Sequence, residues 1–287
     1  MKNKKIQSGF TITELLITMA LGLSIVGSIL VGYMATYTSS MDTLAASKMN
    51  QDLNAVMNLM INEFRRAGYS GNAAAASSPT ENMFNQADGN PDGNAVTALE
   101  VYDSMASNTQ MVPAGDGTWT NGGGVTEGSC IVYAYDRDED GVVDANELGG
   151  FRLNAGVVEL RTAGDVNDPD TCSTSASNIW QALTDSDFIT VSELTFNLDN
   201  SECLNTREPD GIDNDGDGLM YEGLPPNDDL DEADCYDAPM PAAPSGNITV
   251  ETRQISITLT GNLTSDIFVD ISLNQDVRVR NDLVRIR

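Results

Sequence analysis

The first forty residues divide into a short basic head and a long apolar run. Lysines occupy positions 2, 4 and 5, and no charged residue occurs from Leu15 to Met41. About 20 apolar residues suffice for a helix to cross a lipid bilayer. Positive residues beside such a helix stay on the cytoplasmic side. We therefore expect residues 10–35 to span a membrane once, with the N-terminus in the cytoplasm and the rest of the chain outside.

Beyond residue 41 the apolar positions become periodic. They recur at spacings of three and four, which is typical of one face of an amphipathic helix. The residues of this face are Met49, Leu53, Val56, Met57, Met60 and Phe64. Arg65 and Arg66 suit a helix C-terminus, and Gly68 suits its end. The pattern predicts one helix from about Thr11 to about Ala67, whose second half, residues 36–69, packs under a globular domain.

Residues 70–287 are expected to form that domain. Residues 70–94 are rich in Ala, Ser, Asn, Gly and Pro and predict a long loop. After them, short runs alternate apolar and polar residues, as half-buried antiparallel strands do. The predicted strands are Val96–Tyr102, Cys130–Tyr135, Gly149–Leu153, Val157–Arg161, Phe188–Leu198, Val250–Leu259 and Ile267–Ile286. A long helix packed on an antiparallel sheet with long acidic loops is an α+β fold.

The composition narrows the range of functions. Lys and Arg number 15 and Asp and Glu 43, a net charge of −28, so the surface repels nucleic-acid backbones and favours cations. The chain has no histidine, which removes the commonest general base and the commonest zinc ligand. No nucleophile–base set is recognisable in the sequence. We therefore expect no enzymatic activity, and a membrane-anchored calcium-binding hydrolase or a calcium sensor is the least favoured alternative.

Four cysteines, Cys130, Cys172, Cys203 and Cys235, are expected to form two disulfides in an exported domain. The sequence allows three pairings and does not decide among them. Pairing Cys203 with Cys235 would close an acidic loop between them. That choice leaves Cys130 with Cys172.

An acidic residue stands inside the apolar run. A carboxylate such as Glu14 is costly in a membrane, and a plain anchor or an ordinary secretory signal has no use for it. The segment from Gly9 to Glu14 resembles the class III signal of type IV pilins. The resemblance implies that a prepilin peptidase cuts after Gly9 and methylates Phe10, and that Glu14 becomes the fifth residue of the mature chain. In a filament, Glu14 would then pair with the free amine of Phe10 on a neighbouring subunit and set the stagger between subunits.

Two further segments resemble the PilW type of minor pilins. They are Phe64–Tyr69, at the predicted helix end, and Val277–Asn281, near the C-terminus. The resemblance covers the first 70 residues and the tail, whereas the acidic middle of the chain departs from it.

One acidic loop matches a calcium-binding pattern in full. The pattern places acids at positions 1, 3, 5 and 9, a glycine at 6, a carbonyl ligand at 7 and a glutamate at 12. In this chain the predicted ligands are Asp136, Asp138, Asp140, the Val142 carbonyl, Asp144 and Glu147. Gly141 permits the sharp turn, and the flanking residues predict strands instead of the helices of a sensor. We expect one Ca²⁺ here.

A second loop, residues 210–224, carries the first half of the same pattern. Its predicted ligands are Asp213, Asp215, Asp217 and the Leu219 carbonyl, and its second half departs from the pattern. Two interpretations stay open: the loop binds a second calcium ion, or it is a solvated acidic loop.

These features favour a minor pilin that starts or caps a type IV pilus and has a calcium-stabilised head. A pseudopilin of a type II secretion system is the alternative. The expected partners are other pilins and minor pilins through the N-terminal helix, prepilin peptidase, the inner membrane before assembly, and a tip adhesin. The head is expected in the periplasm first and on a cell-surface filament later.

Overall fold

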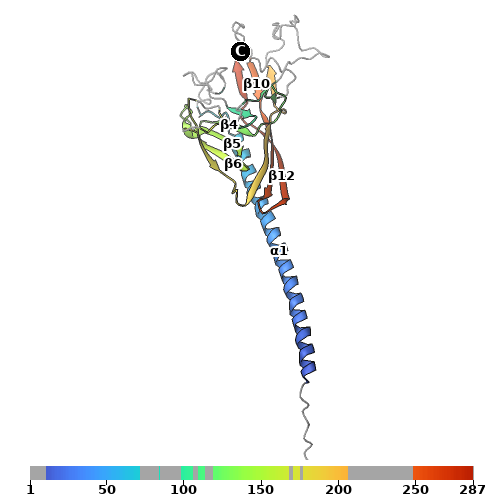
Figure 1. Cartoon of the computed structure of the whole chain (residues 1–287). Coiled ribbons are helices and arrows are strands. Elements are labelled where there is room, and N and C mark those ends of the chain that lie inside the picture. The colour runs from blue at the N-terminus through green and yellow to red at the C-terminus, as the bar shows by residue number, and fades with distance from the viewer. Residues whose placement is uncertain are drawn as a thin grey trace, which may run out of the picture. The chain divides into compact units, whose positions relative to one another are not determined.

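The computed structural model describes residues 11–71, 84, 98–105, 109–113, 119–167, 171–174, 177–205 and 248–286 (Figure 1). The chain forms two compact units, Met1–Lys48 and Met49–Arg287, and each is described by itself.

One helix, α1 (Ile12–Phe64), runs through both units. Its boundaries confirm the predicted long helix to within three residues at either end. In the first unit its large apolar side chains are exposed, Leu23 at 71% and Val31 at 70%. The most apolar 18-residue window has a mean hydropathy of 2.3 and none of it is buried. Such a helix is long and apolar enough to anchor the chain in a membrane.

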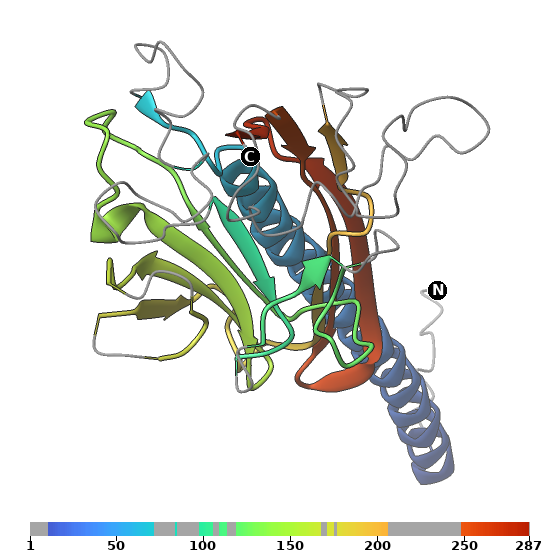
Figure 2. The same cartoon turned by 90° about the horizontal axis from the view of Figure 1, so that it is seen from above.

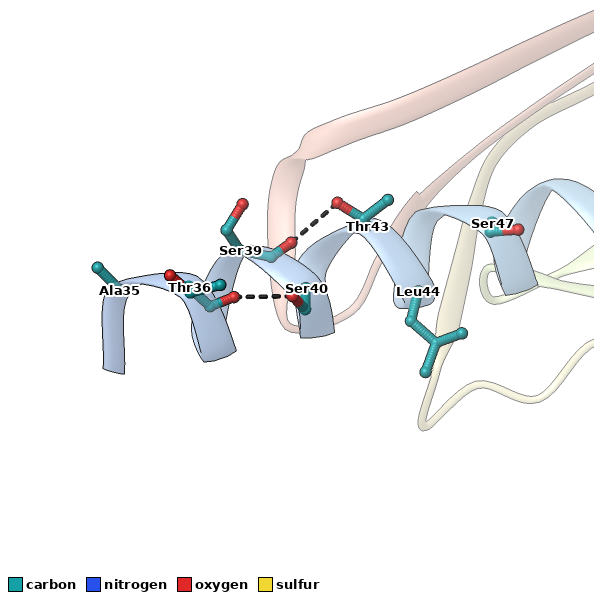
Figure 3. A pocket seen from close by; sticks show the side chains of 7 residues that line it. All are labelled: Ala35, Thr36, Ser39, Ser40, Thr43, Leu44 and Ser47. Carbon is teal, nitrogen blue, oxygen red and sulfur yellow. Dashed lines mark hydrogen bonds between the residues drawn. The ribbon is translucent and has the colours of Figure 1, made fainter. Parts of the chain in front are cut away.

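Several serine and threonine hydroxyls of the first unit donate to carbonyls of the same helix. Ser40 Oγ donates to the Thr36 carbonyl and Thr43 Oγ1 to the Ser39 carbonyl, both at 2.8 Å (Figure 3). These residues line a pocket with Ala35, Leu44 and Ser47. A helix in an apolar environment must satisfy its polar groups in this way, because no water is available there.

The second unit buries the predicted apolar face of α1. All six residues of that face are buried, with Met49, Leu53, Met60 and Phe64 fully so. The Phe64 ring meets the rings of Tyr133, Phe151 and Phe196 edge-on, with centroids 5.5–5.8 Å apart. Because these rings come from different strands, the helix end joins them into one core.

Two main antiparallel sheets surround this part of the helix. The first has the order β1-β4-β5-β6-β7 and the second β12-β11-β8. Figure 2 shows the teal end of α1 between the green strands of the first sheet and the red strands of the second. The strands of the first sheet are β1 (Leu99–Tyr102), β4 (Cys130–Ala134), β5 (Leu148–Asn154), β6 (Val157–Ala163) and β7 (Ile179–Ala182). Those of the second are β8 (Ile189–Asn197), β11 (Gln254–Leu263) and β12 (Asp266–Arg278).

Smaller sheets complete the unit. One has the order β13-β10-β9 and another pairs β2 with β3. Their bounds are β2 (Val112–Pro113), β3 (Trp119–Thr120), β9 (Glu202–Asn205), β10 (Ile248–Thr252) and β13 (Leu283–Ile286). The α+β class is therefore confirmed, whereas β2, β3, β7 and β9 were not predicted.

Two predicted strands were too long. The run Val250–Leu259 breaks at Arg253, whose side chain is buried and donates to the Leu99 carbonyl. The run Ile267–Ile286 breaks after Arg278. β1 begins at Leu99, and the first two residues of the strand expected from Val96 lie outside the described residues. The apolar positions change phase at the first break, from Val250 to Ile255, so the alternation carried a signal of it.

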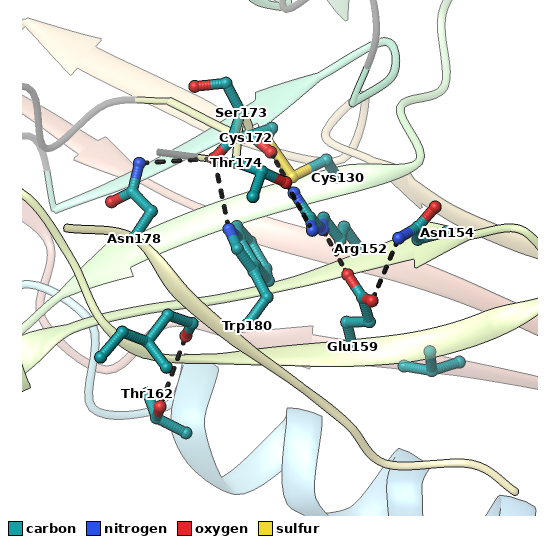
Figure 4. A network of polar contacts seen from close by, with 12 residues as sticks. Cys130, Arg152, Asn154, Glu159, Thr162, Cys172, Ser173, Thr174, Asn178 and Trp180 are labelled. Carbon is teal, nitrogen blue, oxygen red and sulfur yellow. Dashed lines mark hydrogen bonds and ion pairs between the residues drawn. A yellow bond between two sulfur atoms is a disulfide. The ribbon is translucent and has the colours of Figure 1, made fainter. Parts of the chain in front are cut away.

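The predicted Cys130–Cys172 disulfide is present (Figure 4). Arg152, which is buried, donates to Glu159 Oε2 at 2.6 Å and to the Cys172 carbonyl at 2.7 Å, and its guanidinium lies 4.1 Å from the Trp180 ring centre. The disulfide and this arginine together fix the segment around Cys172 to β4 and β5. The other predicted pair, Cys203–Cys235, extends outside the described residues, because Cys235 lies there.

Candidate functional site

The acidic loop of residues 136–147 joins β4 to β5. These strands pair antiparallel, with Ala134 opposite Leu148, so the loop is closed at its base. A short 3-10 helix, η4 (Ala145–Glu147), leads from the loop into β5. The predicted strand–loop–strand context is therefore confirmed.

The loop brings the five predicted carboxylates together. One oxygen each from Asp136, Asp138 and Glu147 lie within 4.8 Å of one another, and so do those of Asp138, Asp140 and Asp144. Asp138 belongs to both groups. Asp136 and Glu147 are buried, whereas the other three are exposed. The arrangement has a closed inner side and an open outer side.

Backbone N–H groups hold the two buried carboxylates in place. Glu147 Oε1 accepts hydrogen bonds from Arg137 N (2.5 Å) and Asp138 N (3.2 Å), and its Oε2 accepts one from Asp144 N (2.9 Å). Asp136 Oδ2 accepts from Gly141 N at 3.1 Å. Gly141 has a φ of 84°, which favours glycine and confirms the predicted sharp turn.

The other oxygen of Asp136 has no partner. Asp136 is fully buried, and its Oδ1 makes no hydrogen bond. Burying a carboxylate oxygen without a partner is costly, and such a group normally pairs with a cation or coordinates a metal. The donor set is all oxygen, which suits a hard cation. The described residues thus fit the metal predicted for this loop.

Arg137 does not supply that cation. Its guanidinium donates to Tyr135 Oη at 3.0 Å and lies 5.4 Å from the centre of the same ring. The positive charge of Arg137 therefore contacts the side chain of Tyr135.

The loop also contacts the chain that follows α1. Gly71 N donates to Asp136 Oδ2 at 3.0 Å, and Asp136 N donates to the Tyr69 carbonyl at 2.8 Å. Tyr69 Oη donates to Glu139 Oε1 at 3.0 Å, and this bond to a carboxylate raises the pKa of Tyr69. A Cβ on Gly71 would lie 2.6 Å from Glu139 Cα. No pattern in the sequence indicates these contacts, which join residues about 65–70 positions apart.

Most of the remaining predicted site residues lie outside the described part of the chain. Val142 N donates to Asp140 Oδ1, while the role of the Val142 carbonyl stays a prediction. Gly9 and Phe10 lie outside the described residues, as do Asp213, Asp215, Asp217 and Leu219 of the second loop.

Glu14 lies at the start of α1. Its Oε2 accepts hydrogen bonds from Thr11 N (3.0 Å) and Thr11 Oγ1 (2.9 Å), and Glu14 N donates to Thr11 Oγ1 (3.3 Å). This reciprocal pairing is the capping box of a helix N-terminus. In the isolated chain, Glu14 therefore caps its own helix and remains exposed.

A family of known proteins matches most of the chain. The sequence model of prepilin peptidase-dependent protein B matches residues 42–279. The chain belongs to this family. No curated protein and no solved structure matches it significantly. The family match excludes the segment Gly9–Glu14, so two separate parts of the chain indicate a type IV pilin-related protein. The family description does not distinguish the PilW type.

Proposed function

We propose that this chain is a minor pilin of a type IV pilus, which helps to start the filament or forms part of its tip. A prepilin peptidase would cut after Gly9, and the subunit would leave the inner membrane by entering the filament. The observation that carries the proposal is the exposed, apolar first half of α1, whose sole charge between residues 12 and 41 is Glu14. The same helix continues into the core of the head.

Glu14 supplies the assembly contact in this proposal. After cleavage, the new amine of Phe10 would lie in the apolar core of the filament, where an unpaired charge is costly. Glu14 of a neighbouring subunit would satisfy it, and its own capping bonds to Thr11 show that it is already held at the helix start. One such pair fixes the axial position of each subunit.

The size and charge of the head favour a minor subunit. Without the three lysines of the leader, a net charge of −31 per copy would repel identical neighbours along a homopolymer. A subunit present in few copies avoids that repulsion. Basic surfaces on other pilins are the complementary partners, and a tip adhesin is a further one.

The resemblance of two segments to PilW-type minor pilins is what favours a pilus over a secretion pseudopilus in this proposal, and these two segments contact each other. Asn281 Nδ2 donates to the Ala67 carbonyl at 3.0 Å and to the Arg66 carbonyl at 3.3 Å. Gly68 has a φ of 73° and its N–H donates to the Ala134 carbonyl at 2.9 Å. The Asn281 side chain therefore satisfies two backbone carbonyls at the helix end, and β4 satisfies the N–H of Gly68. A type II secretion pseudopilin remains the alternative.

Filament incorporation tests the proposal. Glu14→Ala should still insert into the membrane and be cleaved, since removing a charge eases insertion. Its amount in sheared filaments should fall strongly, whereas Thr18→Ala, one turn further along α1, should be incorporated normally. Normal incorporation of Glu14→Ala would show that this carboxylate does not register the subunit.

A deletion strain separates the two filament systems. Loss of surface pili with normal protein secretion is expected. Loss of secretion with normal pili would contradict the pilus assignment and favour the pseudopilin.

A further inference from the structure

We infer that the loop of residues 136–147 binds one Ca²⁺, and that the ion locks this loop onto the segment Tyr69–Gly71, which follows α1. The binding site rests on the loop geometry alone. The stage at which the ion binds in the cell rests on the proposed function, because only an exported head meets extracellular calcium.

The unpartnered oxygen of Asp136 marks where the ion binds. Asp136 is fully buried, its Oδ1 lacks a hydrogen-bond partner, and one of its oxygens lies within 4.8 Å of ligand atoms of Asp138 and Glu147. Three carboxylates so close together repel one another when no cation is present. A divalent cation between them satisfies the orphan oxygen and removes that repulsion.

The donor set selects calcium. All donors are carboxylate oxygens or carbonyls, which hard cations prefer. Calcium accepts six to eight oxygens in an adaptable geometry, whereas magnesium requires a near-ideal octahedron and retains water. The two overlapping groups, which share Asp138, provide an adaptable set on both sides of the loop.

Asp136 connects the bound ion to the residues that follow α1. Its Oδ2 already accepts hydrogen bonds from Gly71 N and Gly141 N, so an ion on Oδ1 fixes the carboxylate that joins these two glycines. Asp136 N and the Tyr69 carbonyl form a further bond of 2.8 Å. Ordering the loop therefore orders the exit of α1, and a filament subunit needs that junction between helix and head to be rigid.

The first test is calcium titration of the full-length chain in detergent after removal of metals by chelation. Calorimetry should show binding with a Kd on the order of 0.1–1 mM, and magnesium should bind at least about tenfold more weakly. Absence of binding heat, together with an unchanged melting temperature, would overturn the site.

Matched variants locate the ion. Asp138→Asn changes an exposed residue shared by both groups and should weaken calcium binding at least about tenfold. Glu127→Gln removes an equal charge from an exposed residue outside the loop and should retain the wild-type affinity. The pair Asp215→Asn and Asp217→Asn tests the second loop and should leave this binding event in place. Unchanged affinity of Asp138→Asn would refute the assignment.

Hydrogen exchange tests the coupling to α1. Calcium should slow amide exchange in peptides covering residues 136–147 and also in those covering 66–71, whereas the β11–β12 hairpin should be unaffected. Protection limited to residues 136–147 would refute the lock while leaving the binding site intact. Melting temperatures in chelator show whether each variant is folded, so a loss of affinity is not mistaken for unfolding.

Discussion

Asp136→Asn should have opposite effects on the calcium-free and calcium-bound head. The substitution keeps the size of the side chain and keeps one oxygen for the two glycine N–H donors. It places an NH₂ group where the unpartnered Oδ1 now lies. In the absence of calcium, that NH₂ can donate to the neighbouring carboxylates instead of repelling them.

The magnitude follows from the geometry. At 4.8 Å, the limit within which these oxygens lie, two unit charges repel by about 3.5 kcal/mol at an effective dielectric constant of about 20. Neutralising Asp136 relieves that repulsion from Glu147, which is also buried. The two bonds to Oδ2 lose their charge assistance, at a cost of about 1 kcal/mol each. The calcium-free variant should therefore be more stable than wild type by about 1.5 kcal/mol, and its melting temperature should rise by about 3–6 °C.

Calcium should reverse the order of the two proteins. At a concentration of 100 times Kd, a bound ion stabilises the wild-type head by about 2.7 kcal/mol. Asp136→Asn loses a ligand and most of that gain. Thermal unfolding with chelator and with calcium measures both effects, with the exposed Asp185→Asn as a control that should change neither. A variant that melts below wild type in chelator, or that keeps the full calcium gain, would refute the reasoning.

Three further predictions concern the head. Burial, with the charge of Glu63, raises the pKa of Tyr133 well above its usual value. Its stabilising effect is therefore complete below about pH 10 and is lost as the pH rises further. Tyr133→Phe should flatten the fall of melting temperature above about pH 10, and an unchanged slope would contradict this. Phe64→Ala should lower the free energy of unfolding by about 3–5 kcal/mol and the melting temperature by about 6–20 °C. Leu44→Ala, at an exposed position, should change neither quantity. Cys172→Ser removes the disulfide, which joins residues 42 positions apart, and should lower the free energy of unfolding by about 4 kcal/mol. Chemical unfolding measures this loss, and a value below about 1 kcal/mol would count against a structural role.

The helix and the strong alternating strands were predictable because their signals are local. The stripe from Met49 to Phe64 follows the helical period, and the buried side chains match it residue by residue. The short strands β2, β3, β7 and β9 were missed, since two to four residues carry no reliable period. The break at Arg253 was missed although the apolar positions change phase there, from Val250 to Ile255. The bond from its side chain to the Leu99 carbonyl, 154 positions away, has no signal in the sequence.

The acidic loop shows the same limit. The spacing of its acids and the position of Gly141 predicted which carboxylates meet, because these are properties of one short segment. Its attachment to Tyr69 and Gly71 depends on how α1 ends beside β4, and no pattern within the loop encodes that. The unpartnered oxygen of Asp136 is likewise a result of packing, and it appears only once the fold is known.

The most direct test of the pilin assignment is the N-terminus of the mature chain. The full-length chain should be expressed with and without an active prepilin peptidase, extracted from membranes, and analysed by intact mass and N-terminal sequencing. With the peptidase, we predict a chain that begins at Phe10 and carries one N-methyl group, and without it the basic leader should remain. A mature chain that keeps residues 1–9 despite an active peptidase, or that begins beyond residue 20, would contradict the account.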